Sequence, residues 1–175
     1  VVMFAGNIGA AQDFETIVLA AELLKEKQDI HWVILGDGRM KDWALEKVRA
    51  SGLDRQVHFL GRHPAERMPE FFAWADVLLV TLKADPVFAK TVPAKVQSYL
   101  ACGRPIIAGL SGEGAQIIRD SQAGEVAQAG NAESLAAAVV KLYQLSKTDR
   151  ENLGKNGRKY FEREFEATEK KKKMD

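Results

Sequence analysis

Short apolar runs recur through the chain, and most contain Val, Ile or Leu at nearly every position. Runs of this kind, without the polar alternation of a half-exposed strand, are typical of parallel strands covered on both faces. We therefore predict strands at residues 2–5, 31–35, 57–60, 77–82, 106–108 and 125–127.

The segments between these runs have helical periodicity. Phe14, Ile17, Val18, Ala21 and Leu24 fall at i, i+3, i+4, i+7 and i+10, which places them on one face of a helix. Further apolar stripes lie at 43–48, 68–75, 94–102, 135–142 and 153–165. Strands that alternate with helices predict an α/β fold, a Rossmann-like doubly wound parallel sheet with helices on both faces.

Chain length and composition indicate one domain. The chain has 175 residues and is 46% hydrophobic, which is enough for a core without disulfide or metal staples. We assign residues 1–165 to this domain and residues 166–175, which contain a lysine run, to a basic flexible tail. Because the chain opens directly on strand-like residues, we interpret it as a piece of a longer polypeptide.

Charge and cysteine content exclude several classes of protein. The net charge is +1, so no large field of one sign favours nucleic acid. No apolar run approaches the roughly 20 residues that span a bilayer, and no signal peptide is recognisable. The single cysteine, Cys102, cannot form an intrachain disulfide and is expected to be a small core residue in a reducing compartment.

Four predicted strands end in glycine-containing loops, at 6–12, 36–40, 61–64 and 109–115. The carboxyl ends of parallel strands share one edge of the sheet, and each loop leads towards a helix N-terminus with unpaired N–H groups. Such loops together predict a ligand that carries phosphate or a nucleotide. The alternative is that tight strand-to-helix turns need glycine whatever they bind.

Common nucleotide and metal motifs are absent. The chain has no GxxxxGK[ST], and its first turn reads GxxG rather than GxGxxG. His31, His58 and His63 are scattered without metal-ligand spacing, so no metal site is predicted. We expect His31 and His58 to pack in strands and His63 to be solvated in a loop.

Lys95 lies at the start of a predicted helix that follows Pro93. The amides of Ala94 and Lys95 would be among the unpaired donors of the first turn, and the Lys95 ammonium adds a full charge. A diphosphate is the natural occupant of this position. The alternative is that Lys95 is an ordinary surface lysine.

Several segments in order carry a family resemblance: "GNIGAAQ", "HWVILGDGRM", "VHFLGRHPAERMPEFFAWADVLLVTL", "TVPAKVQSYLACGRPIIAG" and "AGEVAQAGNAESLAAAVVKL". Over about residues 1–165 the chain resembles the C-terminal half of retaining glycosyltransferases of family 4, which have the GT-B fold. It is most similar to the bacterial branch that transfers amino sugars of the N-acetylfucosamine type during O-antigen or capsule assembly.

This resemblance implies an enzyme with two Rossmann-like halves and an active site between them. This half would bind a UDP-sugar, and the other half would bind a saccharide or lipid-linked acceptor, so this chain alone would be inactive. No metal and no cofactor besides the UDP-sugar substrate is implied. The full protein would be cytoplasmic, with a peripheral contact at the inner face of the membrane as a further expectation.

The resemblance also implies positions for the donor-binding residues. The first loop would lie against the diphosphate and the transferred sugar, Gly36 and the Arg62 backbone against the base, and Ser98 near the ribose. The full set is Gly6, Asn7, Ile8, Gly9, Gln12, Gly36, Arg62, Ala94, Lys95 and Ser98. No catalytic residue is identified.

Two departures from the family pattern concern charge. Asn7 and Gln12 stand where many relatives have an Arg and a Lys, and Lys90 and Ser98 stand where two glutamates are usual. Lys95 is therefore expected to supply positive charge that is missing from the first loop. The alternatives to this enzyme are a flavodoxin- or receiver-like interaction module and a nicotinamide-binding domain.

Overall fold

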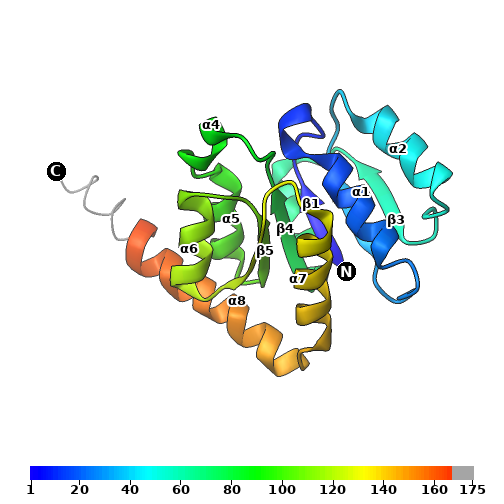
Figure 1. The fold of residues 1–175 in the computed structure, drawn as a ribbon. Helices are drawn as coiled ribbons and strands as arrows, with labels where there is room; N and C mark the ends of the chain where they lie inside the picture. Colours follow the sequence, from blue (N-terminus) through cyan, green and yellow to red (C-terminus); the bar gives the residue numbers. More distant parts are fainter. Residues whose placement is uncertain (167–175) are drawn as a thin grey trace.

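The computed structural model describes residues 1–166 and contains one parallel sheet with the strand order β3-β2-β1-β4-β5-β6. The predicted tail beyond residue 166 lies outside the described residues. The strands are β1 (Val2–Ala5), β2 (Trp32–Leu35), β3 (Val57–Gly61), β4 (Val77–Thr81), β5 (Ile106–Gly109) and β6 (Gly124–Ala127). The chain starts in the middle of the sheet, adds β2 and β3 on one side, and then adds β4 to β6 on the other (Figure 1). The predicted doubly wound sheet is confirmed, with strand ends that differ from the predicted ones by a residue.

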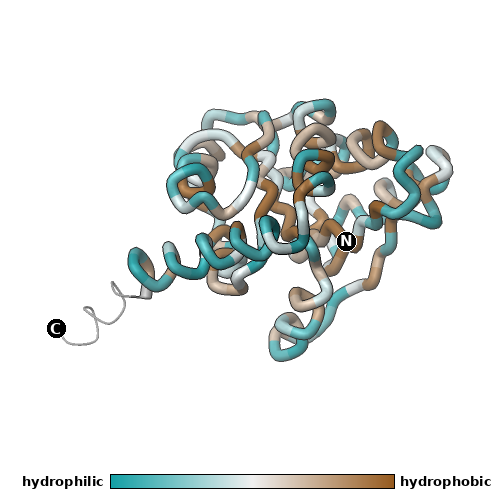
Figure 2. The backbone as a smooth tube through the Cα atoms, turned by 90° about the horizontal axis from the view of Figure 1, so that it is seen from below, coloured by the Kyte–Doolittle hydropathy of each residue, from teal (hydrophilic) through white to brown (hydrophobic). Residues whose placement is uncertain are grey.

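Helices cover both faces of the sheet because successive strand residues point to opposite sides. The longer helices are α1 (Phe14–Leu23), α2 (Lys41–Ala50), α3 (Met68–Trp74), α5 (Ala94–Cys102), α6 (Glu113–Ser121), α7 (Ala132–Gln144) and α8 (Lys147–Phe161). Phe4 packs into a core cluster with residues of α1, α2 and α7, whereas Met3 and Ala5 pack with residues of α3, α5 and α6. Figure 2 shows the hydrophobic strands inside and hydrophilic residues along much of the outer helices.

Two helical segments differ from the sequence prediction. A short helix, α4 (Pro86–Ala89), lies between β4 and α5, where only a loop was expected. The last helix, α8, begins at Lys147 rather than near residue 153, because the Ser146 hydroxyl caps it by accepting from the Asp149 amide at 3.0 Å. Within residues 1–166, no helix is both long enough and apolar enough to cross a membrane.

Cys102 was predicted to be a core residue, and this was wrong. It is exposed at the last position of α5, because the buried stripe of this helix consists of Val96, Tyr99 and Leu100. Gly103 ends the helix with a φ of 67°, as its position in the sequence indicated.

Two histidines that looked scattered in the sequence meet in the structure. Nδ1 of His31, just before β2, lies 3.0 Å from Nε2 of His58 in β3, and the two rings stack. Burial lowers the pKa of His58, and the charge of the nearby His31 lowers it further. Their packing role was predicted, whereas their contact depends on the β2–β3 pairing and could not be read from spacing.

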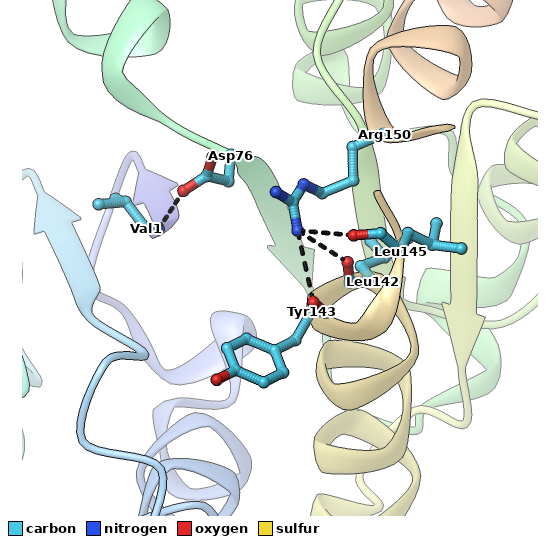
Figure 3. Close-up of polar contacts among 6 residues, drawn as sticks. All are labelled: Val1, Asp76, Leu142, Tyr143, Leu145 and Arg150. Carbon is cyan, nitrogen blue, oxygen red and sulfur yellow. Dashed lines mark hydrogen bonds and ion pairs between the residues drawn. The ribbon is translucent and has the colours of Figure 1, made fainter. Parts of the chain in front are cut away.

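At the edge opposite the strand carboxyl ends, Arg150 of α8 holds the end of α7. Its Nη1 donates to the carbonyl oxygens of Leu142, Tyr143 and Leu145 at 3.2–3.5 Å (Figure 3). These carbonyls lie at the end of a helix, where few backbone donors remain, and the Leu142 carbonyl also accepts from the Leu145 amide at 3.2 Å. The contact therefore fixes the turn between α7 and α8.

Candidate functional site

A cleft of about 490 Å³ opens at the carboxyl ends of β1, β2 and β3, beside the first turns of α5. The lining residues are Ala5, Gly6, Asn7, Leu35, Gly36, Asp37, Arg62, His63, Ala65, Met68, Phe72, Lys95, Ser98 and Tyr99. They come from the ends of two strands, three strand-to-helix loops and two helices, so the cleft forms only when the parallel sheet has assembled. Its position is the one that ligands take in open α/β sheets.

The loops after β1 and β2 pack backbone against backbone. The Gly6 amide donates to Leu35 O at 2.8 Å, and the Ile8 amide donates to Asp37 O at 2.9 Å. Gly36 has a φ of +137°, and a Cβ at this position would collide with the carbonyl of Gly6. A Cβ on Gly38 would likewise collide with the Ile8 carbonyl. The "GDG" glycines are therefore explained by this close approach of two loops.

Lys95 extends from the second residue of α5 into the cleft. Its Nζ lies 4.4 Å from the centroid of the Phe4 ring and fills the space where a side chain on Gly6 would begin. Among residues 1–166, no hydrogen bond or ion pair joins this ammonium to an acceptor. Burial lowers the pKa of Lys95 from its usual 10.5 to about 8. Lys95 is thus a half-buried cation without a counter-ion in the described part of the chain, rather than the ordinary surface lysine of the alternative interpretation.

The first turn of α5 provides backbone donors beside this cation. The amides of Ala94 and Lys95 have no hydrogen-bond partner within the described part of the chain, whereas the Val96 amide donates to Pro93 O at 3.0 Å. Free N–H groups at a helix N-terminus favour an anion. Positive charge and backbone donors therefore converge at one end of the cleft.

Tyr99 attaches this helix to the first strand. Its hydroxyl accepts from the Ala5 amide at 3.2 Å and lies 3.4 Å from the Ala5 carbonyl oxygen, to which it donates. Burial raises the pKa of the Tyr99 phenol above its usual value, so the hydroxyl stays protonated. The bond fixes α5, and with it Lys95, relative to the loop that begins at Gly6.

The far wall of the cleft combines polar and apolar groups. Arg62 and His63 follow β3, and the His63 ring packs on Phe71 with 4.5 Å between ring centroids. His63 Nε2 lies 2.9 Å from the carbonyl oxygen of Leu60 and donates to it. His63 is therefore held against the wall of the cleft, whereas the sequence predicted a solvated side chain.

The structure brings six of the ten predicted site residues together in the cleft: Gly6, Asn7, Gly36, Arg62, Lys95 and Ser98. The Ser98 hydroxyl donates to Ala94 O at 3.4 Å and is exposed, so its oxygen can still accept from a ligand. Ala94 is exposed and does not line the cleft with its side chain, although its free amide lies at the helix N-terminus.

The other three predicted residues serve the first loop itself. Ile8 is fully buried in the core, because the loop turns inward there to meet the loop after β2. Gln12 Oε1 accepts from the Gly9 amide at 3.1 Å, and the Gln12 carbonyl accepts from the Thr81 hydroxyl at 2.6 Å. As the molecule stands, these residues shape the loop and do not line the cleft.

Sequence reasoning missed several lining residues. Met68, Phe72 and Tyr99 were taken for core positions because they lie on apolar stripes, and all three also line the cleft. Asp37, which the sequence placed in a candidate loop, lines it too and accepts from the Gly38 amide at 2.8 Å. The sequence does not show that α3 and α5 lie side by side, and only the folded structure shows that they line the same cleft.

The fourth glycine loop, 109–115, does not contribute to this cleft. Gly112 packs against the backbone of Ala89 so closely that no side chain would fit. The loop therefore supports α4 and the segment before α5. No three His, Cys, Asp or Glu side chains gather into a metal-binding group within residues 1–166.

Comparison with known proteins shows the family of the chain. The model of the family described as glycosyl transferases group 1 matches residues 1–160. The protein named "Probable glycosyltransferase WbjE" from Pseudomonas aeruginosa is 32% identical over 119 residues, which are 68% of this chain and 29% of that protein. The chain spans about a third of the length of the curated relatives it matches.

Solved structures show the same fold at low sequence identity. Anabaena Alr3699/HepE, crystallised in complex with UDP, has a TM-score of 0.79 and 17% identity, over 94% of this chain and 44% of that one. The pneumococcal O-GlcNAc transferase GtfA, in complex with UDP and GlcNAc, has a TM-score of 0.80 and 17% identity, over 99% of this chain and 34% of that one.

Proposed function

The chain belongs to the glycosyl transferases group 1 family, and on this premise we propose that it is the half of a retaining glycosyltransferase that binds the nucleotide-sugar donor. The observation that carries the proposal is the cleft at the strand carboxyl ends, where a half-buried ammonium faces free helix amides. Both kinds of partner favour the binding of a phosphate group.

The donor we propose is a UDP-sugar whose diphosphate lies between Gly6 and the first turn of α5. Asn7, Lys95 and the amide of Ala94 would contact the phosphates, and Ser98 would contact the ribose. Gly36 and the backbone of Arg62 would flank the base. The UDP complexes of two proteins with this fold support the choice of nucleotide.

We further propose an amino sugar as the transferred group and family 4 as the branch. The resemblance of the ordered loops and the GlcNAc in the pneumococcal structure support this choice. A saccharide or lipid-linked acceptor for surface polysaccharide would then be bound by a second domain, at the inner face of the membrane in the lipid-linked case.

In this reaction the bond between the anomeric carbon and the β-phosphate oxygen breaks, and its electron pair stays on the phosphate. The acceptor hydroxyl oxygen bonds to the anomeric carbon with retained configuration, and its proton passes to the leaving phosphate oxygen. Negative charge grows on the leaving UDP, and the Lys95 ammonium with the α5 amides would stabilise it without any rearrangement. No carboxylate in the cleft is assigned as a nucleophile.

Calorimetric titration with UDP, UDP-N-acetylglucosamine and NAD tests the proposal. We expect UDP to bind with a Kd of roughly tens of micromolar to millimolar, because half a site gives only part of the affinity. Lys95→Ala is expected to weaken UDP binding several-fold, by about 1 kcal/mol, through loss of a charge-assisted contact. Lys155→Ala, an exposed change on α8, is the matched control and should leave the titration unchanged. NAD binding without UDP binding would contradict the proposal.

A further inference from the structure

The charge on Lys95 is poorly supported by the protein that surrounds it. The side chain lies between the Phe4 ring and Gly6, and no carboxylate pairs with Nζ within residues 1–166. An aromatic face attracts a cation, but it replaces only part of the lost hydration. The protein around Lys95 therefore disfavours the ammonium form relative to water, and the direction of the Lys95 pKa agrees with this.

The neighbouring ionisable groups do not compensate for this missing partner. Around Lys95 the cleft presents Asp37 from the loop after β2, Arg62 and His63 from the loop after β3, and Tyr99 from α5 itself. The Tyr99 phenol is neutral and bonded to the backbone of Ala5, and Arg62 is itself a cation. The Asp37 carboxylate accepts from the Gly38 amide and is not in ion-pair contact with Lys95.

A bound anion would change this balance. Phosphate oxygens placed between Gly6 and the first turn of α5 would meet the ammonium directly, and a neutral amine would lose that ion pair. Binding of the anion and binding of the proton must then strengthen each other by the same factor.

We propose that a phosphate-bearing ligand and a proton enter the cleft together, the ligand binding to the ammonium form of Lys95 and being rejected by the amine form. This inference rests on the proposed function, since it concerns the diphosphate of the same donor. It adds that affinity for the donor and for the UDP product is set by pH through one side chain.

The linkage has a definite sign. Lys95 loses its proton in the free protein near pH 8, and an ion pair with phosphate shifts that loss to higher pH. Affinity is therefore fully present near pH 7 and falls as the pH rises above about 8. If the bound form keeps its proton to pH 10, the Kd for UDP rises about 30-fold between pH 7 and pH 9.5. The UDP phosphates are fully ionised over most of this range and add little to the change. The uracil N3–H begins to ionise near the top of the range, and this affects wild type and Lys95→Met alike.

The test is UDP titration of the chain at pH 7.0, 8.0, 8.8 and 9.5, with Lys95→Met and Lys155→Met as the variants. We expect a steep loss of affinity for wild type and Lys155→Met, and a weak, nearly constant affinity for Lys95→Met. At pH 8.8, calorimetry in two buffers with different ionisation enthalpies should show proton uptake on binding.

A second measurement needs no variant and so does not depend on the folding of Lys95→Met. The ¹³Cε signal of Lys95, followed by NMR, should titrate near pH 8 in the free chain and above pH 9.5 with saturating UDP. UDP binding with a pH-independent Kd, or an unshifted Lys95 midpoint in the complex, would overturn the coupling and leave the proposed function standing. No UDP binding at any pH would overturn both.

Discussion

At the scale of single residues, Lys95 and Gly6 form one unit. The lysine side chain crosses the position where any Cβ on residue 6 would lie, so the glycine is what lets the ammonium reach the loop after β1. Tyr99, one turn further along α5, sets the distance by its bond to Ala5. A substitution at Gly6 or Tyr99 is therefore expected to displace the Lys95 ammonium as well.

Lys95 also makes the stability of the unliganded chain depend on pH. Its pKa is lower in the folded chain, about 8, than its usual 10.5, so the unfolded chain binds more protons between these values and stability rises with pH there. Between pH 7.5 and 9.5 we expect the free energy of unfolding to rise by about 1–2 kcal/mol more in wild type than in Lys95→Met.

Urea denaturation of the wild type, Lys95→Met and Lys155→Met at the two pH values measures this difference. Lys155→Met controls for the loss of an exposed lysine and should follow wild type. Equal pH dependence in wild type and Lys95→Met would show that the Lys95 amine is solvated in the folded chain.

The position of the charged Lys95 could be predicted from the sequence, whereas the contacts of individual loop residues could not. Lys95 could be found because Pro93 marks a helix start beside a strand end. The loop contacts of Ile8 and Gln12 could not be read from the sequence, since they are made with Asp37 and Thr81 from distant segments. The same limit hid the contact between His31 and His58.

At the scale of secondary-structure elements, α5 holds the cation and α8 holds α5. The Arg158 guanidinium of α8 donates to Ala101 O at 3.1 Å, at the end of α5. Gly154 and Gly157 are the buried positions of α8 and let it closely approach α5, the turn after α5 and Ala123. Glycine in a helix interior costs about 1 kcal/mol relative to alanine, so its presence indicates that this approach is required.

Gly154→Ala tests this packing. The added methyl group would meet the carbonyl of Gly103, which belongs to a turn and cannot move aside as a flexible side chain would. We expect a loss of about 1–3 kcal/mol in the free energy of unfolding, measured by urea denaturation, despite the better helix propensity of alanine. Lys155→Ala, at the next and exposed position, should change stability by no more than about 0.5 kcal/mol. A Gly154→Ala variant as stable as wild type would mean that α8 has room to shift.

Periodicity predicted the existence of most elements, but capping and close contacts decided their ends. The start of α8 depends on Ser146, a cap that lies before any apolar stripe. The helix α4 contains only four residues and has no periodicity to detect. Gly154 and Gly157 of α8 are contact positions, which becomes apparent only once α5 is in place.

At the scale of the whole molecule, topology creates the cleft. β1 and β4 lie next to each other at the centre of the sheet. From β1 the chain continues to β2 on one side, and from β4 it continues to β5 on the other side. The loops after β1 and β2 therefore face the start of α5. The strand pattern made this edge predictable from sequence, because all parallel strands end on the same side. The apolar walls supplied by α3 and α5 could be identified only from the assembled fold.

The central claim is that backbone donors and Lys95 at this edge bind the diphosphate of an activated sugar. Its most direct test is the crystal structure of the chain soaked with UDP. The account predicts phosphate oxygens within hydrogen-bond distance of Lys95 Nζ and of the Ala94 and Lys95 amides, with uracil towards Arg62. UDP bound at the opposite edge of the sheet, or a cleft left empty at saturating UDP, would contradict it.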